Sequence, residues 1–520
     1  MKKSVKRTLY QVYHDIVPTV YHGKLEPRFN RCILSTMRRK NMSFAISKNG
    51  PKFYVNLAVM ALIMVVFRFV TPPDGLNSAG LAVIGVFFGV LYGWMFIDMV
   101  WPSLIGLVVL GMTLSQPMDT VLGGAFGNNT FLLLLFFCMV ASIINAAGIA
   151  EYIARRIICV PFVTGRPYVL IFMLCLAMCA LATMLTMTAA VLVAFPLIKE
   201  VCKQYGYKPG DVFPMIILLA MLYVADIAYM MLPFKSLPAI VFGVYGQLSG
   251  GGEINLAVYV GITAILLLIS IFFVLFMCKY VLKADVTPIL NTRECMHFDE
   301  LLSPYQKTIL WSFVGLIILL LLPNILPGDW AITRFLKAMG NNGILLTFIG
   351  VYLMLSFKEG IGLKEIMNKS VAWPALFLVA AVLRTVEAFE ATGVTAWIGA
   401  VCQPLLAGFS GQLLVFIVVC TTTLVTQLTN NNACAATFAP IAYTLAVANG
   451  TVNPQALLAC VILSCTLGIA TPAAATTSAI LYGDTEWIHQ GTVIRYACFF
   501  WIFNILLISF VGYPLMRVAF

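Results

Sequence analysis

The sequence predicts an all-α polytopic membrane protein that crosses the bilayer about eleven times and contains an inverted repeat. The first observation is composition: of 520 residues, 61% are hydrophobic and 10% are charged, whereas soluble domains carry about 25% charged residues. The second is a series of long apolar runs near the length of about 20 residues that a spanning helix needs. The third is a pair of matched patterns in the two halves of the chain. Solid apolar runs exclude a transmembrane β-barrel, whose strands alternate over about ten residues.

Residues 1–52 form a basic tail before the first apolar run. The tail holds twelve Lys and Arg residues, with Asp15 and Glu26 as its acids, and so carries nearly all of the net charge of +11. This composition is typical of a cytoplasmic N-terminus beside anionic lipid. A nucleic-acid partner is not expected, and the tail lacks the short apolar core of a signal peptide.

The positions of Lys and Arg predict the topology of the membrane part. We place the N-terminus inside and expect two re-entrant hairpins, at about 168–198 and 411–448. The segments then predicted to lie outside contain no Lys or Arg: 115–130, 249–254, 390–410 and 449–454. The exceptions are Arg334 and Lys337 in an outside loop and Arg517 in the outside tail. Since cytoplasmic loops are enriched in Lys and Arg, this asymmetry favours eleven crossings with the C-terminus outside.

A polar stretch at 283–307 divides the membrane part into halves. It is predicted to be a cytoplasmic linker between a first half at 53–282 and a second half at 308–520. No soluble domain interrupts either half. The two predicted hairpins lie one in each half.

The halves share spaced landmarks. Gly148 precedes Pro196 by 48 residues, and Gly393 precedes Pro440 by 47. A triplet of small polar residues begins ten residues before each proline. In the predicted topology the two hairpins enter from opposite faces, which is typical of inverted repeats with a substrate site near the bilayer midplane.

Each hairpin precedes a span that prolines or small polar residues interrupt. The first such span contains Pro233 and Pro238, and the second contains Pro472. One interruption alone favours a simple kink. Two at matching positions favour helices that break within the membrane, where non-helical backbone is tolerated only against protein or a water-filled cavity.

Gly85, Gly89 and Gly93 form a ridge of small residues four positions apart. Such a ridge permits close packing of helices in a membrane. The sequence leaves open whether the ridge packs within one subunit or between two.

Two segments of the second half resemble a known family. They read SVAWPALFLVAAVLRTVEAFEATGVTAWIG and QLTNNNACAATFAPIAYTLA. With the twofold order of hairpin, polar triplet, proline and broken helix, they resemble the divalent anion/sodium symporter family, the dicarboxylate transporters of the ion transporter superfamily. The resemblance covers roughly residues 79–515. It implies a secondary active transporter for small di- or tricarboxylate anions that is coupled to Na⁺, moves like an elevator and forms a homodimer in the plasma membrane. It implies no cofactor, only Na⁺ or H⁺ as the coupling ion.

The resemblance also implies where the anion binds. Where the family has two Ser-Asn-Thr triplets, this sequence has Thr186-Met187-Thr188 and Asn430-Asn431-Asn432. Helix N-termini attract anions, and hydroxyl and amide groups supply neutral donors. The residues expected to bind substrate are Thr186, Thr188, Asn430, Asn431, Asn432, Lys235, Thr476 and Thr477. The alternative is that these polar residues only join neighbouring helices.

Unwound carbonyls and amide oxygens are expected to receive the coupling cation. The residues expected to do so are Asn430, Asn431, Thr471, Ser478 and Asp226, with a Na⁺ ion near Asn431. Met187 cannot replace an Asn ligand, which argues against a Na⁺ site in the first half.

Lys235 and Asp226 lie in the first broken span, and ionisable residues inside a membrane are usually functional. The Lys235 ammonium is expected to replace a bound Na⁺ or to pair with the substrate carboxylate. Snorkelling to an interface or a simple Asp226–Lys235 pair are the alternatives, and Asp226 is a possible proton carrier. A proton-coupled or exchange-type anion carrier therefore remains the alternative to Na⁺ symport. A membrane-embedded enzyme or a channel is least favoured, since the sequence has no GxSxG, HExxH or nucleotide-binding motif.

Overall fold

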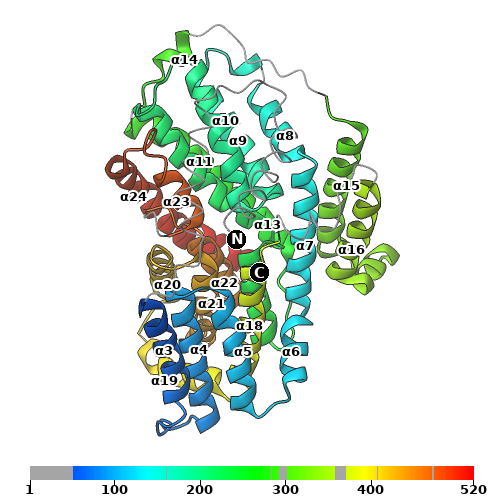
Figure 1. Cartoon of the computed structure of the whole chain (residues 1–520), viewed down its shortest axis with the longest axis vertical. Coiled ribbons are helices and arrows are strands. Elements are labelled where there is room, and N and C mark those ends of the chain that lie inside the picture. The colour runs from blue at the N-terminus through cyan, green and yellow to red at the C-terminus, as the bar shows by residue number, and fades with distance from the viewer. Residues whose placement is uncertain are drawn as a thin grey trace, which may run out of the picture. The chain divides into compact units, whose positions relative to one another are not determined.

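The computed structural model describes residues 51–159, 161–282, 284–291, 301–357, 371–406, 408–470 and 474–520. Every regular element in these ranges is a helix (Figure 1). The chain divides into two compact units, Met1–Ala58 and Val59–Phe520. All predicted site residues belong to the second unit. The predicted tail at 1–52 lies outside the described residues except for its last two positions, as does much of the predicted linker at 283–307.

Within the described residues, eight helices are long and apolar enough to cross a membrane, judged by length and composition. They are α4 (Ser78–Phe96), α7 (Asn129–Ala146), α9 (Pro167–Met184), α11 with α12 (Val212–Leu248), α13 with η2 (Leu256–Val281), α15 with η3 (Pro304–Asn324), α16 (Ala331–Phe357) and α24 with η4 and α25 (Gln490–Ala519). Shorter or more polar helices occupy the remaining predicted crossings: α3 (Pro51–Val66), α5 (Val100–Leu114), α18 (Trp373–Ala391) and α22 (Pro454–Cys465).

The first repeat contains the predicted hairpin. After α7, a short amphipathic helix α8 (Ile149–Ile158) and the turn η1 (Pro161–Val163) lead to α9, which returns as α10 (Met187–Gln204). This antiparallel pair is hairpin 1, and its tip is Leu185-Thr186. The next span is broken, because α11 (Val212–Met231) and α12 (Ser236–Leu248) are separated by four non-helical residues, 232–235, which we call break 1.

The second repeat contains the same elements in the same order. After α18 and α19 (Val394–Leu406), helices α20 (Gly411–Val425) and α21 (Asn431–Asn449) form hairpin 2, with its tip at 426–430. The following span is broken between α22 and α23 (Thr476–Tyr482). This interval, 466–475, is break 2, of which 471–473 lie outside the described residues.

Landmarks in the two repeats adopt matching conformations. Gly148, between α7 and α8, has φ +69°, and Gly393, between α18 and α19, has φ +75°. Such left-handed backbone strongly favours glycine. Thr186 and Asn430 are the N-caps of α10 and α21, and Pro196 and Pro440 lie inside these helices, each ten residues after the cap. The predicted class of an all-α protein with an inverted repeat, two hairpins and two broken helices is confirmed.

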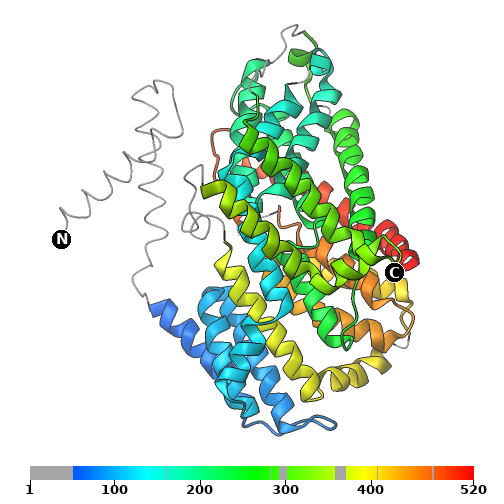
Figure 2. The ribbon, with the colours of Figure 1, turned by 90° about the vertical axis from the view of Figure 1, so that its right-hand side faces the viewer.

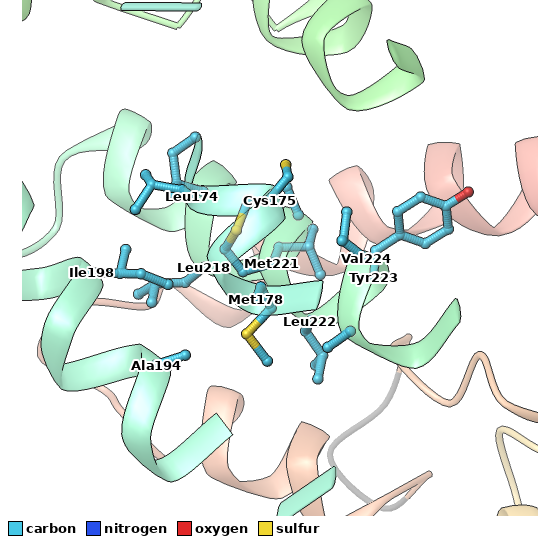
Figure 3. Packing of buried hydrophobic residues seen from close by; sticks show 14 of the residues in the cluster. Leu174, Cys175, Met178, Ala194, Ile198, Leu218, Met221, Leu222, Tyr223 and Val224 are labelled. Atoms are coloured by element: carbon cyan, nitrogen blue, oxygen red, sulfur yellow. The ribbon is translucent and has the colours of Figure 1, made fainter. Parts of the chain in front are cut away.

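Helix α11 forms the core beneath hairpin 1. Seventeen of its 20 residues are buried, as expected for a helix that is apolar on all sides. Figure 3 shows Met178 of α9 and Ala194 of α10 beside Leu218 and Leu222 of α11. Hairpin 2 packs in the same way against α22, and its second arm also packs against α12. Each break is therefore held between buried helices.

Outside these repeats, α15 and α16 pack against each other, and α16 packs on α7 (Figures 1 and 2). Helix α16 is interrupted at Gly340, where φ is 64° and ψ is 167°. The apolar part of α16 that follows Gly340 is therefore continued back to Ala331 through a kink. Two short helices, α6 (Met118–Phe126) and α14 (Thr287–Asn291), complete the described elements.

The glycine ridge of α4 packs within the chain. A Cβ atom built on Gly89 would lie 2.3 Å from Cγ of Met64, and one on Gly85 would lie 2.5 Å from Cβ of Phe67. A Cβ on Gly93 would lie 2.5 Å from the Pro102 ring. The ridge thus leaves room for the end of α3 and the start of α5. It therefore packs within one subunit.

Candidate functional site

The tip of hairpin 2 is built by its three asparagines. Asn430 caps α21, because its side-chain oxygen accepts a hydrogen bond from the backbone N–H of Asn432 at 2.9 Å. Asn is among the best N-cap residues, which explains why the helix begins here. All three side chains are half-buried. The positive end of α21 and two further amide groups therefore meet at one point.

Asn431 connects this tip to break 2. Its Nδ2 donates to the carbonyl oxygen of Thr466 at 2.9 Å, and its Oδ1 accepts a hydrogen bond from the Thr426 hydroxyl at 2.8 Å. Gly468 leaves room for the amide, because a Cβ there would lie 3.1 Å from Oδ1 of Asn431. The amide oxygen of Asn431 is consequently fixed beside the unwound backbone.

Side chains from the tip of hairpin 2, from α21 and from α23 bind carbonyl groups at the end of α22 and in break 2. Carbonyl oxygens of six consecutive residues, 465–470, accept side-chain hydrogen bonds. The donors are Thr426, Asn431, Gln427, Ser478 and Tyr482. Gln427 also accepts a hydrogen bond from the backbone N–H of Ala470 at 3.0 Å. Since a carbonyl oxygen has two lone pairs, a carbonyl that already accepts one donor still has the capacity to face a cation.

Break 1 is organised differently, around one ammonium group. Lys235 is 3% exposed, and its Nζ donates to the carbonyl oxygen of Leu185 at the tip of hairpin 1, at 2.7 Å. Nζ also lies 4.6 Å from the ring centre of Tyr229 and 5.5 Å from that of Phe137, within the range of cation–π attraction. A single positive charge thus joins the hairpin tip to the break.

Two alternatives for Lys235 are wrong. Its burial excludes snorkelling to an interface. Asp226 is also buried, in α11, but no ion pair joins it to Lys235 within the described chain.

The two repeats meet at the start of α12. Ser236 follows Lys235, and its hydroxyl donates to Oδ1 of Asn432 at 3.3 Å. The structure therefore brings Lys235, the tip of hairpin 1 and the asparagines of hairpin 2 into one region.

Other predicted residues lie around this region with different exposure. Thr186 caps α10, accepting from the N–H of Ala189 at 3.4 Å, and Thr188 is half-buried in the first turn. Thr476 is exposed, whereas Thr477 and Ser478 are buried. Within the described residues, no side-chain hydrogen bond joins Thr188, Thr476 or Thr477 to the asparagines. Thr471 lies outside the described residues.

Sequence reasoning missed four residues that shape the site: Thr426, Gln427, Ser236 and Gly468. Thr426 and Gln427 lie four and three residues before Asn430, the first of the asparagine triplet, and both are buried. A buried amide in an apolar hairpin requires partners, and that requirement could have identified Gln427. Nothing local in the sequence marks Ser236, whose partner is 196 residues away.

Known proteins resemble this chain in sequence and in fold. The sequence profile of the family described as citrate transporter matches residues 42–463. The sodium-dependent dicarboxylate transporter SdcS of Staphylococcus saprophyticus is 25% identical over 479 residues, which cover 86% of this chain and 89% of that protein. This similarity agrees with the resemblance drawn from the hairpin motifs.

Two solved structures share the fold at 14% identity. The YdaH transporter of Alcanivorax borkumensis gives a TM-score of 0.54 over 90% of this chain and 98% of that chain. MtrF of Neisseria gonorrhoeae, from a class of antimetabolite efflux pumps, gives 0.56 over 91% and 97%. Both are membrane transporters, and the present chain is likewise a multi-pass membrane transporter and not an enzyme. With its family profile matched over most of the sequence, the chain belongs to the citrate transporter family.

Proposed function

We propose that this protein is a secondary active transporter that moves small di- or tricarboxylate anions together with Na⁺ by alternating access. The observation that carries the proposal is the junction of hairpin 2 and break 2, where the oxygen of Asn431 is fixed beside six consecutive, side-chain-bonded carbonyls. Unwound carbonyls and amide oxygens suit a small cation. The family description and the sodium-dependent dicarboxylate relative support the substrate class and the ion.

In this proposal the anion binds where the repeats meet. The N-termini of α10 and α21 present positive partial charge to it. The proposed substrate ligands are Thr186, Thr188, Asn430, Asn431, Asn432, Lys235, Thr476 and Thr477. The proposed cation ligands are Asn430, Asn431, Ser478, Thr471 and Asp226, with Na⁺ near Asn431.

The mechanism and the setting are also proposed. The repeats would move against a scaffold in an elevator-like manner, within a homodimer in the plasma membrane. The N-terminus would lie in the cytoplasm, as the distribution of Lys and Arg predicts. The matched hairpins and breaks of two inverted repeats support alternating access, since such repeats can exchange conformations.

The test is uptake of labelled succinate and citrate into proteoliposomes, with and without an inward Na⁺ gradient. We expect Na⁺-driven accumulation. Asn431→Ala removes a proposed cation ligand and two partly buried hydrogen bonds, each worth about 1–3 kcal/mol when a partner is left unpaired, so the Na⁺ concentration for half-maximal uptake should rise at least about tenfold. Asn449→Ala, at the far end of the same helix, is the matched control and should change little. Absence of any carboxylate uptake by folded protein would refute the proposal.

One observation favours a second arrangement, in which the carrier exchanges anions or uses protons. Lys235 already places a positive charge between hairpin 1 and break 1, as a bound Na⁺ would. Asp226, buried in α11, is then a proposed proton carrier. Uptake that needs unlabelled substrate inside and ignores Na⁺ would favour exchange, whereas uptake driven by a pH gradient would favour proton coupling.

Variants of Lys235 test whether its ammonium group takes part in transport. Lys235→Met removes the charge but keeps the apolar stem. Transport should therefore be lost if anion exchange or proton coupling depends on the ammonium group. Lys235→Arg should retain part of the activity. Lys208→Met, at an exposed turn, controls for the loss of a positive charge. Wild-type uptake by folded Lys235→Met would remove Lys235 from the mechanism.

A further inference from the structure

A polar cavity of about 740 Å³ lies beside break 1, and none of the predicted site residues lines it. It is lined by the start of α7, by α12, by the loop before α13, by η3 and by the kinked part of α16. Its volume is within the range of about 300–1,000 Å³ for small-molecule sites. Pro233 and Phe234 of break 1 line it, and both are buried, so the cavity reaches the backbone next to Lys235.

The lining is rich in neutral hydrogen-bond donors. Six side-chain amides contribute to it: Asn128, Asn129, Gln247, Asn324, Asn341 and Asn342. Amide groups donate to oxyanions without requiring a counter-charge. Lys337 and Glu253 are the charged residues that line the cavity, and no ion pair joins them within the described chain.

The kink of α16 places amides at this cavity. At Gly340 the helix leaves helical geometry, and the next two residues are Asn341 and Asn342. Nδ2 of Asn342 donates to the carbonyl oxygen of Asn129 at the start of α7, at 3.0 Å, while its buried Oδ1 has no partner in the described chain. The interruption of α16 places amide side chains against a polar cavity. This arrangement indicates a surface for binding polar groups rather than a packing defect.

The topology predicted from the distribution of Lys and Arg would place this cavity on the outer face. Asn128 and Asn129 belong to the segment 115–130, and Glu253 to the segment 249–254, both of which lack Lys and Arg and are predicted to lie outside. The chain on either side of η3 also reaches the outer face in that topology.

We infer that the cavity is an outer vestibule that collects the carboxylate anion, with Lys337 as its attracting charge and the amides as transient ligands, before the anion reaches break 1. The inference rests on the proposed carboxylate transport. A vestibule of this kind affects capture rather than turnover. Substitution of a charged residue at the rim of the vestibule should therefore change the KM for the anion and leave kcat unaltered.

Kinetics of charge variants test the attraction. Lys337→Gln should raise the KM for citrate about three- to fivefold at low ionic strength, and the effect should shrink in high salt because surface charges are screened. Glu253→Gln should lower KM. Arg334→Gln is the matched control, since Arg334 lies one turn away on α16 but does not line the cavity. Equal KM values for Lys337→Gln and Arg334→Gln would overturn the inference.

Labelling tests occupancy and sidedness directly. Asn341→Cys and Asn324→Cys should react with a membrane-impermeant maleimide added outside, and citrate should slow that reaction. Arg334→Cys should react without protection, and the wild-type protein gives the background. Reaction only from the inside, or no protection by citrate or succinate, would overturn the vestibule. If the wild-type protein took up no carboxylate, the proposed transport would be refuted instead. Protection of Asn341→Cys by citrate would still show whether the cavity binds the anion.

Discussion

The hydroxyl of Ser236 lies 3.3 Å from the side-chain oxygen of Asn432, although 196 residues separate them. Ser236 begins α12 directly after break 1, and Asn432 belongs to the tip of hairpin 2. The bond therefore joins the broken helix of one repeat to the hairpin of the other. Any motion of one repeat against the other at this point must keep or break that contact.

A double-mutant cycle should measure this contact. Ser236→Ala and Asn432→Ala should each raise the KM for citrate, and the double variant should lose less than the sum, with a coupling of about 1 kcal/mol. Asn449 and Thr451, which are hydrogen-bonded at the other end of α21, provide a control pair whose alanine variants should leave KM unchanged. Strict additivity of the Ser236 and Asn432 effects would show that the bond has no role in substrate binding.

Gly468→Ala should weaken Na⁺ dependence without unfolding the protein. The added Cβ would lie 3.1 Å from Oδ1 of Asn431 and 3.2 Å from Cβ of Ala474, so the Asn431 amide would have to shift. We expect the Na⁺ concentration for half-maximal uptake to rise several-fold at unchanged thermal stability. Gly399→Ala in α19, whose Cβ would make an ordinary contact at 3.8 Å, is the control. An unaltered Na⁺ response would separate Gly468 from the cation site.

Gly393→Ala should destabilise the protein through the backbone alone. No atom lies within 4 Å of the added Cβ, but φ is +75°, and left-handed backbone costs about 1–2 kcal/mol for a residue with a side chain. Gly315→Ala, in helix α15 with equally open space, should instead stabilise by up to about 1 kcal/mol. Thermal unfolding in detergent compares the two. Similar shifts for both variants would contradict the conformational explanation.

The ion pair between Lys199 and Asp484 connects hairpin 1 to the chain after break 2. Both side chains are largely buried, at 22% and 19% exposure. Asp484→Asn should therefore lower stability by about 1 kcal/mol or more, above the median for exposed pairs. The exchanged pair, Lys199→Asp with Asp484→Lys, should recover part of this loss. Glu151→Gln breaks a pair in which both partners are about half exposed and should have a smaller effect.

Local signals explain why the sequence predicts the hairpins. Thr186 and Asn430 cap the second helix of each hairpin, and the prolines ten residues later repeat the spacing. These features act within a few residues and so can be recognised without tertiary information. The same is true of Gly148 and Gly393, whose backbone conformation requires glycine.

The contents of the two breaks depend on distant partners. Break 1 has four residues and break 2 has ten, yet prolines mark both in the sequence. Gln427 donates a hydrogen bond to the carbonyl oxygen of Leu467, 40 residues away in the sequence, and Lys235 donates one to the carbonyl oxygen of Leu185, 50 residues away. Charge and apolar surroundings indicate that Lys235 is functional, but they do not identify its acceptor. The kink at Gly340 could not be read from hydropathy, which rises only after Asn342.

The density of hydrogen bonds around break 2 has a consequence for how a cation would bind there. The described part of break 2 is ordered by hydrogen bonds within the chain, so its backbone loses its conformational entropy when the protein folds. A cation that binds there then meets a preorganised shell and spends little of its binding energy on ordering the backbone. Under the proposed Na⁺ coupling, binding of the ion would therefore leave the order of this loop almost unchanged. Amide hydrogen exchange at 466–470 should be nearly the same in Na⁺ and in choline.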